Sequence, residues 1–115
     1  MTPETIIGRI ARHYGLSASE LTSRSRVRHI AYARQVAAWG LRTALPKLSL
    51  ATIGELLGNL DHTTVIYSVR QIADAVAADA ALAAELYGLI GQAPPRPTRR
   101  ADDAIWRDVR YVRTA

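Results

Sequence analysis

Four consecutive polar residues stand directly before an apolar pattern with helical spacing, namely Asp61, His62, Thr63 and Thr64. At the start of a helix, Asp commonly acts as a cap, because its carboxylate accepts hydrogen bonds from free backbone N–H groups. The same side chains can contact base edges in the DNA major groove: Asp accepts from cytosine, His bonds a purine, and Thr offers a methyl and a hydroxyl group. The row therefore predicts either a capped, solvated helix start or a surface that reads base pairs.

A second group of residues, upstream of this row, could bind a polyanion. Between Leu21 and Leu50 the sequence has no acidic residue and six basic ones. These are Arg24, Arg26, Arg28, Arg34, Arg42 and Lys47. With a formal net charge of +5, such a one-sided basic field suits a nucleic-acid partner, and an ordinary solvated face is the alternative that charge alone leaves open.

The elements that must position these residues are all predicted to be helices. Apolar spacing and capping signals predict helices over residues 3–14, 17–21, 31–44, 50–57, 62–78 and 80–90, with an irregular basic loop at 22–30. No alternating strand pattern is present. We therefore expect an all-α, six-helix domain over residues 1–92. It is followed by a basic Pro- and Arg-containing tail over 93–115, which opens with the Pro-rich break at 94–97.

The predicted core follows from the inward faces of these helices. The expected core residues are Ile6, Ile7, Ile10, Ala11, Tyr14, Val36, Ala37, Gly40, Leu41, Ala44, Leu50, Ile53, Leu56, Leu57, Val65, Val69, Ile72 and Val76. Trp39 is expected to lie partly in the core. An apolar content of 49% over 115 residues suffices for one modest core.

The fourth and fifth predicted helices are short neighbours joined by residues 58–60, a tight turn that contains Gly58. Two helices joined in this way form a helix-turn-helix unit, in which the second helix enters the DNA major groove with its N-terminal residues against base edges. The polar row occupies that position. Because similar helical turns also occur in proteins that do not bind DNA, the shape alone does not decide the function.

Longer stretches around this turn carry a family resemblance. The stretch "LGNLDHTTVIYSVRQI" is similar to the signature G-G-R-D-H-T-T-V-[LIM]-x-[AS]-x-[RK]-K-I, and upstream "ARQVAAWGLR", "LSLATIGELLG" and "HYGLSASELTSRSRVRHI" are similar to further segments of the same family. The family is the C-terminal DNA-binding domain, or domain IV, of the bacterial replication initiator DnaA. The resemblance spans residues 3–90.

The resemblance implies a role for each part of the site. In the family, the domain binds a short asymmetric DnaA box in double-stranded DNA as a monomer. Base contacts are implied for Arg28, in the minor groove, and for Asp61, His62, Thr63 and Thr64, in the major groove. Phosphate contacts are implied for Arg34, Gln35 and Arg42. From their charge and position we expect further phosphate contacts from Arg24, Arg26 and Lys47.

The sequence departs from the family pattern at several positions. Leu60 replaces an arginine, Ala33 a proline, Tyr32 a basic residue and Tyr67 a histidine. Two functions therefore stay open. One is a sequence-specific DNA-binding protein that competes with or modulates the initiator at DnaA-box-like sites, regulating replication initiation or transcription. The alternative is a mimic of the initiator domain that acts by binding a replication-regulator protein.

Several function classes are disfavoured by what the sequence lacks. It has no cysteine and no G-x-x-x-x-G-K-[ST] phosphate-binding run, and its three histidines lie on different predicted elements. We therefore expect no enzyme activity, no small-molecule substrate, no metal site, no cofactor and none of the initiator's ATPase module. No apolar run approaches the length of a membrane span. The expectation is a cytoplasmic, nucleoid-associated protein that acts as a stand-alone domain.

Overall fold

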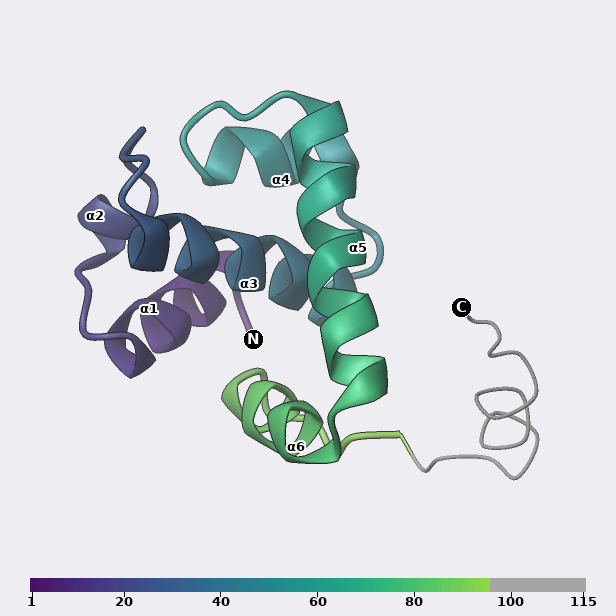
Figure 1. The fold of residues 1–115 in the computed structure, drawn as a ribbon. Helices are drawn as coiled ribbons and strands as arrows, with labels where there is room; N and C mark the ends of the chain where they lie inside the picture. Colours follow the sequence, from purple (N-terminus) through teal and green to yellow (C-terminus); the bar gives the residue numbers. More distant parts are fainter. Residues whose placement is uncertain (96–115) are drawn as a thin grey trace.

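The structure is a computed structural model that describes residues 1–95 of the chain. Within that range it contains six α-helices and no strand (Figure 1), which confirms the predicted all-α fold. The helices are α1 (Pro3–His13), α2 (Ala18–Leu21), α3 (Arg28–Ala44), α4 (Leu50–Leu56), α5 (His62–Ala78) and α6 (Ala80–Leu89). The predicted boundary of the domain near residue 92 falls just after α6, whereas most of the predicted tail lies outside the described residues.

Side chains cap five of the six helices at their amino ends, as the capping signals predict. These caps are Thr2, Ser17, Ser49, Asp61 and Asp79. Ser17 and Glu20 form the predicted capping box, since the Glu20 backbone N–H donates to Ser17 Oγ at 3.0 Å and the Ser17 N–H donates to Glu20 Oε1 at 2.9 Å. Only α3 begins without a side-chain cap, at Val27.

Helix α3 is the centre of the molecule and packs against all five other helices. Residues 36–41 of this helix are buried. They include Trp39, which is 3% exposed and meets Tyr87 of α6 edge-to-face at a ring-centroid distance of 5.0 Å. Trp39 is therefore more deeply buried than its sequence position suggests. Small side chains such as Ala33 and Ala37 let the neighbouring helices approach α3 closely.

Most of the predicted core is buried. The confirmed positions are Ile6, Ile7, Ile10, Ala11, Val36, Ala37, Gly40, Leu41, Ile53, Leu57, Val65, Ile72 and Val76. The other five lie at the edge of the core, half-buried and packed against it: Tyr14, Ala44, Leu50, Leu56 and Val69. Leu86 and Ile90 complete the core from the α6 end.

The start of α3 corrects one sequence prediction. The helix begins at Arg28, about three residues earlier than expected, and the Ala31 N–H donates to the Val27 carbonyl at 2.9 Å in its first turn. Nothing in the Arg28–Ile30 stretch breaks a helix, so tertiary packing decides the boundary. The irregular basic segment is therefore residues 22–27, hereafter the arm, and Arg28 stands on the first turn of α3 instead of in a loop.

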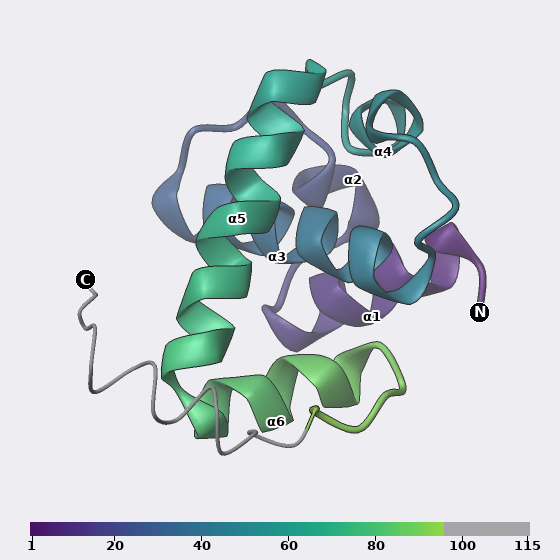
Figure 2. The ribbon, with the colours of Figure 1, turned by 90° about the vertical axis from the view of Figure 1, so that its right-hand side faces the viewer.

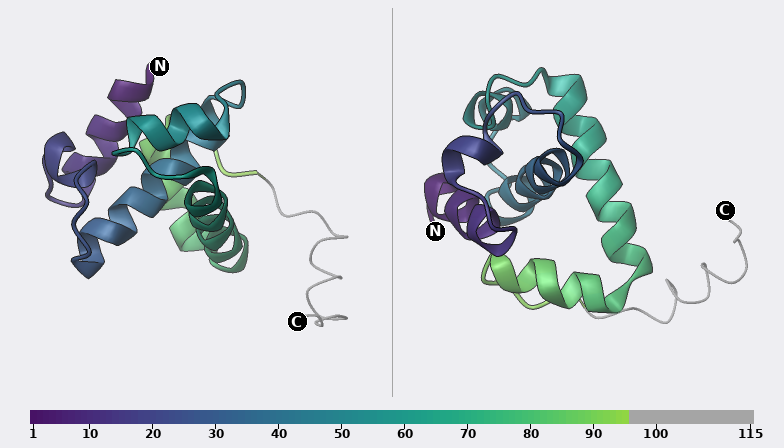
Figure 3. Two further views of the ribbon diagram at one scale, coloured as in Figure 1. Left: turned by 90° about the horizontal axis from the view of Figure 1, so that it is seen from above. Right: turned by 60° about the vertical axis from the view of Figure 1, so that its left-hand side comes forward.

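Helix α5 runs along one side of the molecule, from α4 at one end to α6 at the other (Figures 2 and 3). Helix α6 turns back against α1 and α3 and closes the end opposite α4. There His13 Nε2 lies 2.6 Å from Glu85 Oε2, at the surface between α1 and α6. Such an exposed pair contributes at most about 1 kcal/mol. The core, and not this pair, therefore holds α6 in place.

Candidate nucleic-acid interface

The turn between α4 and α5 is made by backbone conformations that favour small or polar residues. Gly58 has φ +95° and Asn59 has φ +64°, both in the left-handed region. The Leu60 N–H donates to the Gly54 carbonyl at 2.9 Å. A Cβ atom at Gly54 would overlap the Leu60 carbonyl oxygen, so only glycine lets the turn fold back so tightly on α4. These contacts fix the angle at which α5 leaves the turn.

The same turn touches the base of the arm. A Cβ atom at Gly58 would overlap the carbonyl oxygen of Thr22, the first residue of the arm. Thr22 is separated from Gly58 by the whole of α3 and α4. The close approach of the two backbones therefore couples the position of the arm to the amino end of α5.

The row at the amino end of α5 is open to solvent. Residues 61–64 are all exposed, whereas Val65, the next residue, is completely buried and anchors the first turn of α5 against the core. None of the four polar side chains is covered by the described part of the chain. The row is thus presented on a helix start that the core holds in place.

Asp61 acts as the cap of α5. Its Oδ1 atom accepts a hydrogen bond from the Thr64 N–H at 2.8 Å, and this bond lowers the pKa of the Asp61 carboxyl below its ordinary value. The cap uses Oδ1, and because the Asp61 side chain is exposed, its other carboxylate oxygen is accessible to a ligand. Capping and contact with a ligand are therefore compatible, because they use different oxygen atoms.

The arm and the start of α3 form a basic surface. Arg24, Arg26 and Arg28 are all exposed. The first turn of α3 contains no acidic residue and its N–H groups have no side-chain cap at Val27. Free N–H groups at a helix start carry partial positive charge. They therefore add to the charge of the arginines, and the surface attracts anions.

Arg34 points into the molecule, toward the arm. Its Nε atom donates to the Leu21 carbonyl at 2.9 Å and its Nη2 atom donates to the Ser25 carbonyl at 3.0 Å. The side chain is partly buried, and this burial lowers the pKa of its guanidinium. A phosphate contact by Arg34 stays a prediction, but one edge of the guanidinium is already occupied by its own chain.

The other predicted phosphate contacts lie further along α3 and in the loop that follows it. Gln35 is half-buried and Lys47 is exposed. Arg42 is exposed, and its Nη1 atom lies 3.4 Å from the Pro46 carbonyl and 3.3 Å from the Leu48 carbonyl. These long hydrogen bonds hold the loop between α3 and α4 and leave the rest of the Arg42 guanidinium free for solvent or a ligand.

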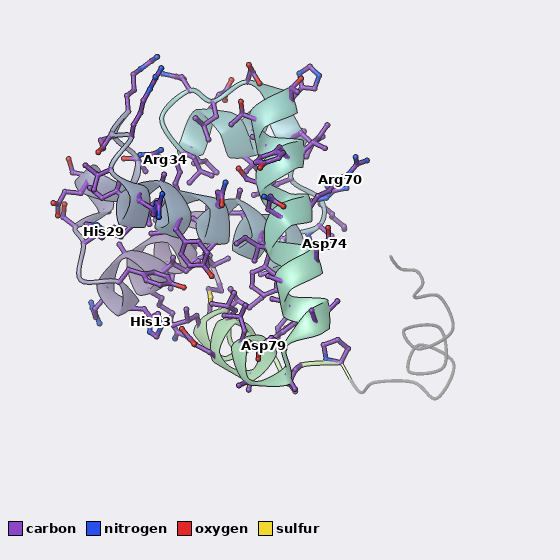
Figure 4. The ribbon with its side chains drawn as sticks, in the orientation of Figure 1. His13, His29, Arg34, Arg70, Asp74 and Asp79 are labelled. Atoms are coloured by element: carbon purple, nitrogen blue, oxygen red, sulfur yellow. The ribbon has the colours of Figure 1, made fainter. Side chains whose placement is uncertain are left out.

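The fold brings the arm and the start of α5 to the same edge of the molecule. In Figure 1 both lie at the upper edge, with α4 between them, and α6 lies at the opposite end. Figure 4 shows Arg34 beside the arm, and Asp74 and Asp79 toward the other end of α5. The upper edge is therefore the basic one, and it carries the polar row.

Ser23, Ser25 and Gly54 also shape this edge, and none of the three was predicted from the sequence. For the two serines, the alternation in "SRSR" (residues 23–26) was an available signal, since Ser side chains often bond nearby backbone groups. For Gly54 no local signal exists. Its role comes from the turn that folds back on it.

Comparison with known proteins identifies the origin of this arrangement. The family model described as "Bacterial dnaA protein helix-turn-helix" matches residues 3–72, more than half of the chain. The chain belongs to this DnaA helix-turn-helix family. The match ends within α5, after the turn, the polar row and the first half of the helix, so it includes every predicted contact residue.

Relatives of the DnaA family match over the same region. The chromosomal replication initiator protein DnaA of Chloroflexus aurantiacus is 38% identical over 89 residues, which are 77% of this chain and 18% of that protein. DnaA of Brucella abortus is 47% identical over 77 residues, 67% of this chain and 15% of that protein. DnaA of Synechocystis is 50% identical over 70 residues, which are 61% of this chain and 15% of that protein. The chain thus spans less than a fifth of the length of these relatives.

Two further properties of the described residues concern metal ions and membranes. Residues 1–95 contain no group of three His, Asp or Glu side chains placed to hold a metal ion. None of the six helices combines the length and the apolar character needed to cross a membrane.

Proposed function

We propose that this DnaA-type domain binds double-stranded DNA at DnaA-box-like sites. In the proposed complex, the amino end of α5 enters the major groove, where Asp61, His62, Thr63 and Thr64 contact base edges. The arm and the start of α3 reach the neighbouring minor groove with Arg28. By occupying such sites, the protein competes with or modulates a replication initiator and thereby regulates initiation or transcription.

One observation carries this proposal: residues 61–64 are exposed at the start of a helix that is anchored by completely buried Val65. A base-reading surface needs this combination, because its side chains must be accessible while their backbone is fixed. The DnaA-family match, which includes the row, supports the same assignment.

The charge distribution supports the position of the DNA backbone. Arg24, Arg26 and Arg28 are exposed on the same edge as the row. Arginine is attracted into narrow minor grooves by their negative potential, and further arginines neutralise phosphates. The interface therefore offers both kinds of contact that sequence-specific proteins use.

The alternative, a mimic of the initiator domain that binds a regulator protein, receives less support. Leu60 and Tyr32, two departures from the family pattern, are half-buried and pack against the hydrophobic core, so they offer little exposed surface for docking. Tyr67 is exposed, but a single exposed aromatic residue does not make a protein interface.

The proposal is tested by binding to two fluorescent duplexes of equal composition, one with a DnaA box and one with the box shuffled. We expect His62→Ala and Thr63→Ala each to weaken binding to the box by about 1–3 kcal/mol and to leave binding to the shuffled duplex unchanged. Asp74→Ala, on an exposed position far along α5 (Figure 4), is the control and should not weaken either.

Two outcomes would count against the proposal. Equal affinity of the unmodified protein for both duplexes would exclude specific recognition of a DnaA box. Equal losses of the variants on both duplexes would show that the row does not read bases. Recovery of a replication-regulator protein by the unmodified protein, without any preference of that protein for a DNA sequence, would favour the alternative function.

A further inference from the structure

The arm has no regular secondary structure, yet its backbone is held by side-chain hydrogen bonds. Ser23 Oγ donates to the Glu20 carbonyl at 2.6 Å and accepts from the Ser25 N–H at 3.3 Å. Ser25 Oγ accepts from the Val27 N–H at 3.1 Å. The two serines thus bond the backbone at Glu20, Ser25 and Val27, which covers most of the arm and the end of α2.

This pattern determines which residues of the arm are exposed. Ser23 and Ser25 are half-buried, while the intervening Arg24 and Arg26 are exposed. Because the serine side chains bond to nearby backbone groups, they stay close to the chain, and the two arginines between and after them are left at the surface.

Arg34 holds the same segment from inside the molecule. Its hydrogen bonds to the Leu21 and Ser25 carbonyls join the end of α2 to the middle of the arm. A guanidinium has five N–H donors in a rigid fork, and these two bonds use its Nε–H and one Nη2–H. One of the two edges that can make a bidentate phosphate contact is therefore already engaged with the backbone.

The arm is also fixed relative to the helix-turn-helix. The backbone of Thr22, at the base of the arm, lies in direct contact with Gly58 of the turn. Arg34 therefore holds a segment, from Leu21 to Ser25, that already contacts the turn before α5 through Thr22. A change in the arm's conformation would alter the position of its arginines relative to the base-reading row.

We propose that Arg34 is a positioning residue that presets the arm, and with it the adjoining Arg28 at the start of α3, for contact with the minor groove and its phosphates. It acts through the Leu21 and Ser25 carbonyls, together with the Ser23 and Ser25 hydroxyls, so that Arg24 and Arg26 extend toward the duplex before DNA arrives. This inference rests on the proposed function, because the arm's target is the bound duplex. Preorganisation of this kind improves affinity by reducing the conformational entropy lost on binding.

The first test uses the free protein and needs no DNA. Amide hydrogen exchange is measured for the Ser25 and Val27 N–H groups in the unmodified protein, Arg34→Gln and Arg34→Lys. We expect Arg34→Gln to lower protection in the arm by about tenfold, the equivalent of one net hydrogen bond, and Arg34→Lys to restore part of it, since lysine keeps one donor contact.

Arg42→Gln is the matched control. Arg42 is also an arginine of α3 that donates to two carbonyls of its own chain, but in the loop between α3 and α4. This variant should leave exchange in the arm unchanged. Unchanged exchange in the arm of Arg34→Gln would overturn the proposal, whatever the result with DNA. If Arg34→Gln does not fold, the double variant Ser23→Ala/Ser25→Ala tests the same network.

The second test asks whether the arm's reading of DNA depends on Arg34. Single A·T pairs of a box duplex are replaced in turn by G·C and by inosine·C, which lacks the minor-groove amino group of guanine. We expect Arg34→Gln to reduce discrimination between G·C and inosine·C by about fivefold to tenfold and to keep discrimination by the α5 row.

The two tests separate failure of this proposal from failure of the proposed function. A general loss of affinity at every position, together with a decrease of about 0.9 in the salt slope, would assign Arg34 to a phosphate contact and contradict positioning. A different result would contradict the proposed function instead: Arg34→Gln lowers protection in the arm as expected, but the unmodified protein shows no preference for the box. Arg34 would then still be the residue that holds the arm in position.

Discussion

At the scale of single residues, Asp61 combines two tasks in one carboxylate. Oδ1 caps α5 through the Thr64 N–H, and the Asp61 side chain nevertheless stays exposed to solvent. The neighbouring His62, Thr63 and Thr64 are exposed in the same turn. The capping role of Asp61 is therefore compatible with a role in the proposed interface, because the cap holds the helix start on which the polar row stands.

The lowered pKa of Asp61 gives a testable pH dependence. Because the pKa is lower in the folded protein than its ordinary value of 3.8, the carboxylate contributes stability that is fully present above that value. The contribution is lost as the pH falls from there through the lowered folded pKa. We expect Asp61→Asn, which retains a capping side chain, to lose less stability over this acid range than the unmodified protein in urea titrations at each pH. Parallel losses in the two proteins would contradict the assignment.

At the scale of elements, the helix-turn-helix depends on two glycines, each of which lets a different backbone segment approach closely. Gly54 leaves room for the Leu60 carbonyl within the turn, and Gly58 leaves room for Thr22 of the arm. The first contact fixes α5 on α4, and the second fixes the arm on the turn. Recognition helix and arm are thus held by adjacent parts of one short segment.

A pair of glycine substitutions measures the close approach at the turn. We expect Gly54→Ala to lower the free energy of unfolding by about 1–3 kcal/mol or more, because the added methyl group overlaps backbone that cannot move freely. Gly8→Ala in α1 is the control. No atom lies within 4 Å of its added Cβ, and alanine should stabilise the helix by about 0.5–1 kcal/mol. Urea denaturation checks both values. If Gly54→Ala raised the free energy of unfolding as much as Gly8→Ala, the described turn would be contradicted.

Much of the helical framework could be predicted from the sequence, because it follows from local chemistry. The caps at Ser17, Ser49 and Asp61 act on N–H groups within three residues, and the apolar spacing of α5 shows its buried face directly. The exposed row follows from the same local rules. Its proposed use came from the helix-turn-helix spacing and from the resemblance to DnaA, which the family match confirms.

The remaining features depend on contacts between residues distant in the chain. The bond of Arg34 to the Leu21 carbonyl joins residues thirteen positions apart, and the contact of Gly58 with Thr22 spans two helices. Neither is encoded in a local pattern. For the same reason the sequence did not show that α3 begins at Arg28 or that Leu60 packs on the core.

At the scale of the whole molecule, the proposed DNA-binding residues lie at one edge and α6 lies at the opposite end. The arm and the start of α3 lie at one edge, while α6 and the Asp79 cap close the other end (Figure 1). The tail that follows adds six arginines and three acidic residues over positions 93–115. Its charge makes it a candidate for additional contacts with phosphates.

Removing residues 93–115 separates the domain from its tail. We expect the shortened chain to unfold cooperatively, because every buried residue of the described core lies before position 92. The logarithm of the affinity for DNA should still fall linearly with the logarithm of the salt concentration, with a slope of about −0.9 per phosphate neutralised. We expect this slope to be less steep than in the complete chain. Thermal unfolding and binding at several salt concentrations check both points. Loss of cooperative unfolding would contradict the domain boundary, and an unchanged slope would exclude tail contacts.

The central claim is that one face of the protein occupies two adjacent grooves of a duplex, with the start of α5 in the major groove and Arg28, at the start of α3 next to the arm, in the minor groove. Methylation interference on a box duplex tests this most directly, because dimethyl sulfate marks guanine N7 in the major groove and adenine N3 in the minor groove. We predict interference at both, on neighbouring segments of the box, with loss of the minor-groove signal alone in Arg28→Ala. Interference in one groove only, or at no position, would contradict the account.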